Sequence, residues 1–441
     1  MFARLRRLGA RIAESLFYLP ALGVAAAAFL AFFVTWADRA RADTIAEIPL
    51  LMRTTVDGAR AVLTTAAAAT ITVAGIVLSV TVVAVQLAAS QFSPRVVVTI
   101  FGSRFQQVVI AIVTGAFTYD LLVLSTIHSA SVLEGEPTRT LSVTLALVLA
   151  VVSVMAIIAF IDHSVGVMQV GEIIRRTSDA TLAVLRRHLP ERGTAPGTDD
   201  QVRLPPAPAT TIRSTLDGWI QHVDTEALLE ALPPGSVARL DVDTGWFVGV
   251  GSPLATVWMN HEDADDLVED RVCRAVGIGR SRSTQSDPTY GVRQLVDVAL
   301  RALSPGINDP TTANEVILHL TEILREVLVR DMPPRVIHGA GGRRLFRPHQ
   351  WTRGDWVGHA FQEVRIASTD QPEVARALIR SMGSLLEHLE HVGLAGRAEI
   401  LPKEAALVLA GIESNGSLLE EDTAPIRDLA VALRLAPTEE H

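Results

Sequence analysis

The residues best suited to chemistry lie in one motif, Arg282–Ala313. Within it Arg293, Asp297 and Arg301 follow one another at intervals of four, so they share one face of a helix. A carboxylate between two guanidinium groups can form an ion-pair ladder, and two arginines can instead hold an anion. Two alternatives therefore stay open, a structural ladder that fixes the helix and a site for an anion or small cytoplasmic effector.

Two Asp-Pro pairs mark the helices that would position this ladder. Asp287 and Asp309 are suited to cap a helix, because the proline after each is suited to the first helical position. The run Ser304–Gly306 ends the first of these helices, so the motif predicts a helix–turn–helix unit. Asn308 lies in that turn, and we group it with Asp309 and the ladder as a candidate effector or structural site.

The other residue patterns predict neither catalysis nor metal binding. The chain has no His-Glu-x-x-His, nucleophile-elbow, phosphate-loop or kinase signature, so we expect no enzyme, no catalytic residues and no cofactor. His359 and Glu363 are four residues apart, which suits metal ligation only on a buried face. We interpret them as part of a surface helix and expect no metal site.

Charge and hydropathy divide the chain into two parts. The 441 residues are 49% hydrophobic and carry a net charge of −9. Residues 1–161 hold 11 Arg or Lys and 8 Asp or Glu, whereas the remaining 280 residues hold 28 and 40. A membrane-like part thus precedes an acidic part. The single cysteine excludes a disulfide scaffold, and the absence of a long basic cluster argues against nucleic acid as a partner.

Four stretches are long and apolar enough to cross a bilayer as helices, which takes about 20 residues. They cover residues 16–36, 61–90, 108–127 and 141–161. The first stretch is longer than the usual apolar core of a signal peptide, so we expect it to remain in the protein as a membrane anchor. The predicted fold class is an α-helical integral membrane protein with four transmembrane helices and a mixed α/β, mostly helical, cytoplasmic C-terminal domain. The lipid bilayer is therefore one partner.

The distribution of arginine predicts the orientation in the membrane. Arginines are in excess before the first span, between the second and third spans, and after the fourth span, whereas the other two loops balance them with acids. Because cytoplasmic loops carry the positive excess, both termini are expected in the cytoplasm of a multi-pass inner-membrane protein. An unpaired cysteine, Cys273, agrees with that compartment.

Residues at alternating steps of three and four share a helical face, and from Ala61 to Ala89 one face of the second span is small or polar at every step but one, Val82. Its polar and glycine members are Thr65, Thr72, Gly75, Ser79 and Gln86. Small residues let helices pack closely, which is one interpretation of this face. Small and hydroxylated residues around a symmetry axis can also line a water-filled pore, which is the other.

Asp120 is the only ionisable residue well inside a predicted span. A charge at that depth is costly, so Asp120 is a functional candidate that should face the bundle interior, a partner or water. The residue lies about two turns from the outer end of the span, so snorkelling towards the interface is the alternative.

The acidic part after the spans is predicted to contain a stalk, a linker and a domain. Residues 1–163 form the transmembrane domain, and residues 164–211 predict an amphipathic stalk helix followed by a proline-rich linker. Residues 212–441 predict a cytoplasmic α/β domain. Its small β element covers about 235–258, where glycine and proline bound short strand patterns, and the remainder is helical.

Three motifs carry a resemblance to a known family: Arg293–Ala313, Ser90–Arg95 after the second span, and Ala159–His163 at the end of the fourth. With them, nearly the whole chain resembles a bacterial family of predicted membrane proteins defined as domain of unknown function 2254. The resemblance implies a membrane protein with a cytoplasmic domain and brings no catalytic residues. Asp120 departs from the apolar or small residue that the resemblance implies in that span.

Two functions fit these observations. The first is a homo-oligomeric, channel-like protein that passes ions, with the second span near the axis and a cytoplasmic vestibule or regulatory domain. The second is a non-conducting membrane-anchored sensor or scaffold whose cytoplasmic domain binds a protein or a small effector. A transporter is disfavoured because the four spans show no inverted repeat.

Overall fold

The computed structural model describes most of the chain. The described residues are 18–40, 55–91, 104–130, 140–167, 169–194, 204–205, 209–259 and 266–437. They fold into two compact units, Met1–Glu172 and Ile173–His441. The division falls inside the stalk helix that the sequence predicts, nine residues after the expected end of the transmembrane domain at residue 163.

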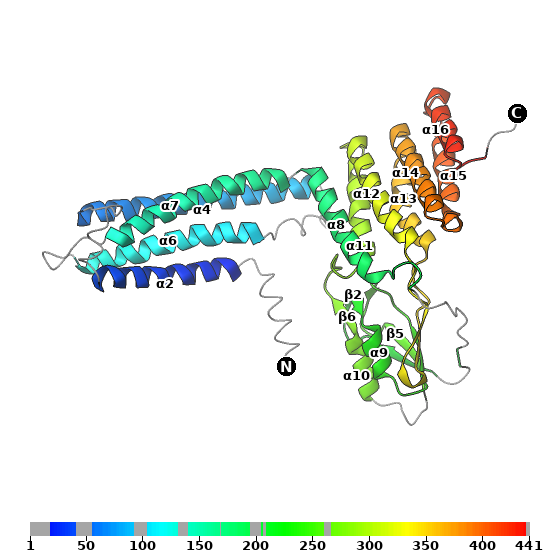
Figure 1. The fold of residues 1–441 in the computed structure, drawn as a ribbon, viewed down its shortest axis with the longest axis horizontal. Coiled ribbons are helices and arrows are strands. Elements are labelled where there is room, and N and C mark those ends of the chain that lie inside the picture. The colour runs from blue at the N-terminus through cyan, green and yellow to red at the C-terminus, as the bar shows by residue number, and fades with distance from the viewer. Residues whose placement is uncertain are drawn as a thin grey trace. The chain divides into compact units, whose positions relative to one another are not determined.

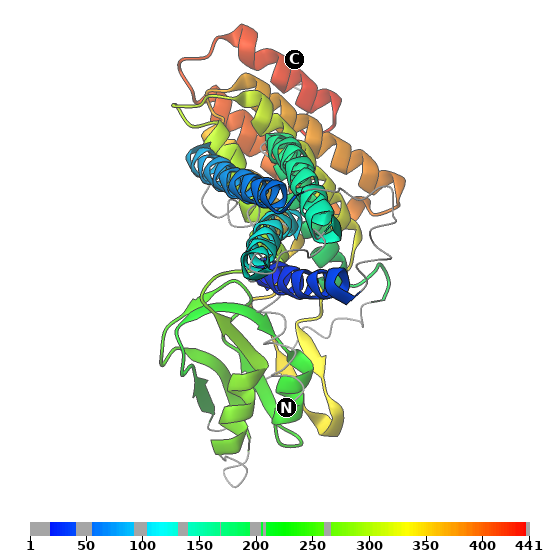
Figure 2. The same ribbon diagram turned by 90° about the vertical axis from the view of Figure 1, so that its left-hand side faces the viewer.

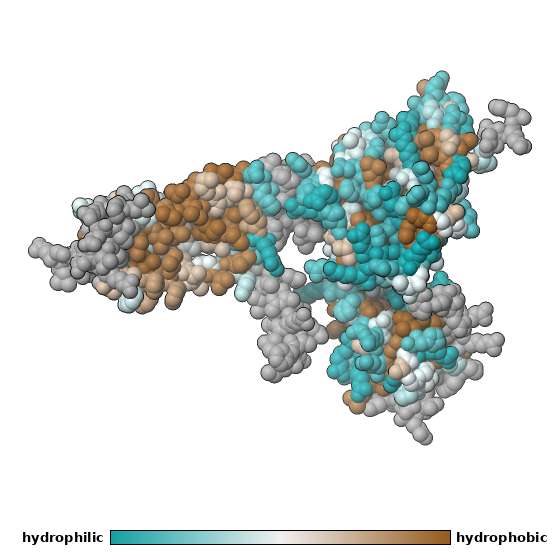
Figure 3. Space-filling model, in the orientation of Figure 1, coloured by the Kyte–Doolittle hydropathy of each residue, from teal (hydrophilic) through white to brown (hydrophobic). Residues whose placement is uncertain are grey.

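The first unit is a bundle of four long helices (Figure 1). They are α2 (Tyr18–Ala40), α4 (Val56–Gln91), α6 (Arg104–Ala130) and α7 (Thr140–Val167). All four are long and apolar enough to cross a membrane, and their surface is largely apolar (Figure 3). The segments that meet this criterion are Tyr18–Asp38, Val56–Val83, Arg104–Ile127 and Leu141–His163. The four predicted spans are confirmed, and the second begins five residues earlier than predicted.

Helix α6 contacts each of the other three helices, and its contact with α2 depends on small residues. A Cβ atom placed on Gly23 would lie 2.8 Å from the carbonyl oxygen of Ala111. A Cβ atom on Gly115 would lie 3.3 Å from the carbonyl oxygen of Gly23. The two backbones therefore approach as closely as small residues allow, which is how helices gain packing energy where lipid tails are as apolar as the side chains.

We predict that Gly23→Leu disrupts this contact. The added side chain must displace the backbone of α6, and overpacking of this kind typically costs about 1–3 kcal/mol. Thermal unfolding of the purified full-length protein in detergent would measure the loss. Ala25→Leu is the matched control, because Ala25 lies on the exposed face of the same helix. Equal unfolding temperatures for both variants would contradict the packing role of Gly23.

The second unit contains two small β-sheets. The strands in the described residues are β1 (Thr210–Arg213), β2 (Gly218–Val223), β3 (Val237–Leu240), β4 (Phe247–Val248), β5 (Pro253–Trp258), β6 (Val276–Gly279), β7 (Val336–His338) and β8 (Arg344–Phe346). One sheet has the order β1-β5-β3-β8-β7, with only the β3–β8 pair parallel. The other is antiparallel, with the order β4-β2-β6.

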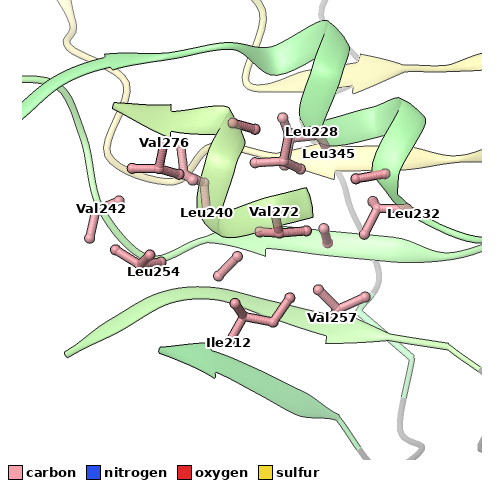
Figure 4. Packing of buried hydrophobic residues seen from close by; sticks show 14 of the residues in the cluster. Ile212, Leu228, Leu232, Leu240, Val242, Leu254, Val257, Val272, Val276 and Leu345 are labelled. Carbon is pink, nitrogen blue, oxygen red and sulfur yellow. The ribbon is translucent and has the colours of Figure 1, made fainter. Parts of the chain in front are cut away.

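Two short helices, α9 (Thr225–Ala231) and α10 (Asp266–Ala275), pack together and complete the core of this β region. Figure 4 shows Ile212, Leu240 and Leu345 from three strands beside Leu228 of α9 and Val272 of α10. The sequence predicted strands at about 235–258, where β3, β4 and β5 lie. The other strands were missed, and β1 already begins within the predicted linker.

Helices form the rest of the second unit, and Figure 2 shows the C-terminal ones, in orange and red, at the opposite end of this unit from the strands. They are α8 (Val170–His188), α11 (Pro288–Ala302), α12 (Pro310–Val329), α13 (Arg353–Ala367), α14 (Pro372–His391), α15 (Ile400–Glu413) and α16 (Glu420–Ala432), with the 3-10 helices η2 (Ala340–Gly342) and η3 (Ala395–Arg397). Helix α12 contacts α11, α13 and α14. Helix α8 lies against α11, where a Cβ atom on Gly291 would be 2.0 Å from the Thr181 hydroxyl.

Candidate functional site

The small and polar face of α4 points away from the bundle. All five of its predicted members are exposed: Thr65, Thr72, Gly75, Ser79 and Gln86. The opposite face of α4 packs inside the bundle, and its buried residues are Ala59, Leu63, Ala66, Ala67, Thr70 and Val77. The small face is therefore not used for packing within one chain.

This face differs from the exposed surfaces of the neighbouring helices. Helix α2 exposes Phe29, Phe32, Phe33 and Trp36. Helix α7 exposes Leu147, Val148, Val151, Met155 and Ile158. Bulky apolar side chains of this kind suit contact with lipid. On α4 the described side chains also include exposed bulky residues, and Val82 and Val83 lie on or beside the small face itself, so the face combines small and polar residues with a few bulky ones.

The threonine hydroxyls on the α4 face are oriented by their own helix. Thr65 donates to the carbonyl of Ala61 and Thr72 donates to the carbonyl of Ala68, both at 2.7 Å. Each hydroxyl proton is thus used inside the helix, and the oxygen lone pairs stay available on the exposed side. Such oxygens can accept hydrogen bonds from water or contact a cation.

A second polar group lies inside the bundle and joins three helices. The Asp38 carboxylate on α2 accepts hydrogen bonds from the backbone N–H of Ser142 at 3.0 Å and from its hydroxyl. The Tyr119 hydroxyl on α6 donates to the Ser142 carbonyl at 3.1 Å. The bond to the Ser142 N–H satisfies one of the first N–H groups of α7, which have no intrahelical partner.

Asp120 follows Tyr119 on α6 and is fully buried, with 0% of its surface exposed. Neither of its carboxylate oxygens has a hydrogen-bond partner among the described residues. A buried carboxylate without a partner is costly in its charged form, so this position calls for a proton, a cation or a group outside the chain. Asp120 remains a candidate functional residue on this geometry.

In the second unit the helix–turn–helix motif forms as predicted. The Asp287 carboxylate accepts from the backbone N–H groups of Thr289 and Tyr290, and Asp309 accepts from that of Thr312 at 3.1 Å. Hydrogen bonds from the Thr312 hydroxyl and backbone lower the pKa of Asp309. The predicted caps are therefore confirmed.

Asn308 makes the turn between the two helices. Its φ of 49° lies in the left-handed region, which asparagine tolerates better than most residues. The side-chain oxygen accepts a hydrogen bond from Gln371 at 3.2 Å, immediately before α14. Asn308 thus joins the start of α12 to the start of α14.

The ladder on α11 has a partner that the sequence did not indicate. Arg293 donates to Asp297 at 2.8 Å and also to Glu363 on α13. Burial alone would lower the pKa of Arg293, but the hydrogen bond to Glu363 and the charge of Asp297 outweigh it and raise the pKa. One guanidinium thus lies between two carboxylates and links α11 to α13, whereas Arg301 is exposed.

We predict that Arg293→Ala lowers the unfolding temperature of the second unit by several degrees. The substitution leaves the buried Asp297 carboxylate without this charge-assisted hydrogen bond, a loss of about 1–3 kcal/mol. Calorimetry of the purified protein would measure the change. Arg274→Ala removes an arginine that is 71% exposed and should leave the unfolding temperature unchanged. An unchanged unfolding temperature in Arg293→Ala would contradict a structural role for the ladder.

A buried ion pair fixes the start of α11. Arg282 donates to the Asp287 carboxylate at 2.6 and 2.9 Å, and its guanidinium lies over the Tyr290 ring at 4.9 Å. A Cβ atom on Gly245 would lie 2.7 Å from both charged side chains. The turn at Gly245 in the β region therefore closes over the N-terminus of α11. Sequence reasoning found the cap but missed Arg282.

His359 lies against the same helix start. Its Nε2 atom is 3.0 Å from the carbonyl oxygen of Thr289. Burial lowers the pKa of His359, the hydrogen bond to Thr289 opposes this, and the charges of Arg282 and Arg293 lower it further. The sequence interpretation as a surface helix was incomplete, because His359 is half-buried. No group of three potential metal ligands converges among the residues that the structure describes.

The lowered pKa of His359 predicts a pH dependence of stability. The unfolded chain binds the proton more readily than the folded chain, so the stability should fall as the pH drops below the ordinary value of 6.5. His359→Gln should reduce the decline in unfolding temperature between pH 7 and pH 5.5. The exposed His338 supplies the control variant, His338→Gln, which should keep the full decline. The same decline in all three proteins would exclude His359 as its source.

Together the two units define a multi-pass membrane protein with four candidate spans and a mixed α/β, mostly helical, second unit. The chain belongs to the family described as "Predicted membrane protein (DUF2254)", which matches residues 13–384. Uncharacterized proteins of Mycobacterium bovis and Mycobacterium tuberculosis are each 32% identical to it over 348 residues. The aligned region covers 77% of this chain and 66% of each relative, slightly under two thirds of their length. No solved structure gives a significant match.

Proposed function

We propose that the chain forms a homo-oligomeric, channel-like protein with α4 near the axis and the second unit as a cytoplasmic vestibule or regulatory domain. The observation that supports this is the outward direction of the small face of α4, which one chain leaves uncovered. In this proposal the protein is not an enzyme. Both termini lie in the cytoplasm, as the distribution of arginine favours.

A ring of chains would cover this face with copies of itself. Gly75 and Ser79 lie at the middle of α4 and allow neighbouring α4 helices to approach around an axis. The 36 residues of α4 span about 54 Å, which exceeds a hydrocarbon core of about 30 Å. A pathway along α4 would therefore cross the whole bilayer and continue beyond one surface.

The chemistry of the face favours cations. The hydroxyl oxygens of Thr65 and Thr72 keep lone pairs on the exposed side because their protons are donated within the helix. Residues 162–441 carry a net charge of −12, from 28 basic and 40 acidic residues. An acidic vestibule raises the local concentration of cations.

Cross-linking and conductance together test this proposal. In a Cys273→Ser background, Ser79→Cys should give cross-links between copies in membranes, whereas Ala25→Cys on the exposed face of α2 should not. Purified protein in planar bilayers should conduct cations, and Gly75→Leu or Ser79→Leu should remove most of the conductance by narrowing the pathway. Ala25→Leu adds the same bulk to α2 and should conduct normally.

The sensor or scaffold is the alternative, and these measurements separate the two functions. Cross-linked oligomers that stay silent under varied voltage, tension and ionic conditions would exclude conduction and leave the sensor or scaffold. A monomer without cross-links through Ser79→Cys would exclude the assembly itself.

A further inference from the structure

A cavity of about 570 Å³ lies between α12 and α14, in the helical part of the second unit. This volume falls in the range of about 300–1,000 Å³ that is typical of small-molecule sites. Its wall on α12 includes Asn314, Leu318 and Arg325, and its wall on α14 includes Arg376 and Arg380. None of these residues belongs to the ladder of α11 or to the membrane spans.

The two helices that line the cavity run parallel. At their starts Gln371 donates to Asn308 at 3.2 Å, and towards their ends Arg325 donates to Ser384 at 3.3 Å. The cavity residues on each helix recur at intervals of three and four, so each helix contributes one continuous face. Both walls are therefore held by regular helices that are fixed at either end.

The cavity contains more guanidinium groups than its carboxylates neutralise. Arg325 pairs with Glu322 at 3.1 Å. Arg376 and Arg380 lie four residues apart on one face of α14, where like charges repel each other. No ion pair to either of them is found within the described part of the chain, although Glu373 lines the same cavity. An anion between the two guanidinium groups would remove this repulsion.

Two further polar atoms in the cavity walls lack partners. The Nε atom of Arg325 and the side-chain oxygen of Asn314 are buried and have no hydrogen-bond partner among the described residues. A buried donor or acceptor left without a partner is costly, and native proteins rarely keep one without a reason. The Arg325 nitrogen is a donor and the Asn314 oxygen is an acceptor. A ligand that satisfies both must therefore carry an acceptor for Arg325 and a hydroxyl or N–H group that donates to Asn314.

We propose that this cavity binds a small organic phosphate that carries hydroxyl groups. The phosphate accepts from Arg376 and Arg380, because guanidinium groups match phosphate oxygens in pairs. A hydroxyl donates to Asn314, and Leu318, which is 64% exposed, packs against the carbon skeleton. This inference goes beyond the proposed conduction and does not depend on it.

Binding of glucose 6-phosphate to the purified full-length protein tests the site. Titration calorimetry should show saturable binding, with glucose and inorganic phosphate each binding more weakly because each lacks one half of the ligand. Arg376→Gln and Arg380→Gln should each weaken binding about tenfold or more, as the loss of a charge-assisted hydrogen bond does. Arg274→Gln removes the same charge from the exposed surface of α10 and should bind normally.

Thermal unfolding supplies an independent measurement. Without ligand, Arg380→Gln should be at least as stable as the unmodified protein, because a like-charge contact is removed. Glucose 6-phosphate should raise the unfolding temperature of the unmodified protein and of Arg274→Gln only. No saturable binding in the millimolar range, equal weakening by Arg274→Gln, or full binding by the Arg376→Gln/Arg380→Gln protein would each overturn the proposal.

Discussion

The membrane unit depends on the close approach of α2 and α6. Helices in lipid gain little from burying apolar side chains, so their association relies on close packing and on polar groups that meet inside the bundle. Gly23 and Gly115 provide the packing, and the bonds among Asp38, Tyr119 and Ser142 provide the polar contact. Helix α4 joins this bundle through its opposite face, where Leu63, Thr70 and Val77 are buried, so its small face is not needed for the fold of one chain. Its composition then requires a reason outside the single chain.

The second unit depends in a similar way on Asp287. This carboxylate caps α11, pairs with Arg282 and lies where the turn at Gly245 meets the helices. A cap and a buried ion pair on one carboxylate leave it no acceptor capacity to spare for a ligand. At its first cap the motif therefore has an architectural role. The second cap of the motif, Asp309, begins α12, and this helix contributes Arg325 to the wall of the cavity.

Local signals in the sequence predicted local structure well. The length of the apolar stretches predicted the four spans, and the Asp-Pro pairs predicted the starts of α11 and α12. Both signals are contained in one continuous segment of the chain and need no distant partner. The short strands β6 and β8 were missed, since three or four residues carry no clear period and their partners β2 and β3 lie far away in sequence. Glu363 was missed as a partner of Arg293 for the same reason, as was the cavity between α12 and α14.

The direction of the small face of α4 could not be predicted from the sequence and is given only by the structure. Helical periodicity shows that Thr65, Thr72 and Ser79 share a face. It does not show whether that face points into the bundle or away from it. Packing within the chain would have required that face to be buried, and the structure buries Leu63, Thr70 and Val77 on the opposite side. Where lipid alone covers a helix, bulky residues are expected along its whole outward face, as on α7. On α4, glycine and hydroxyl groups lie among the exposed bulky residues and favour a neighbouring helix or water, and the proposed ring of α4 helices would provide both.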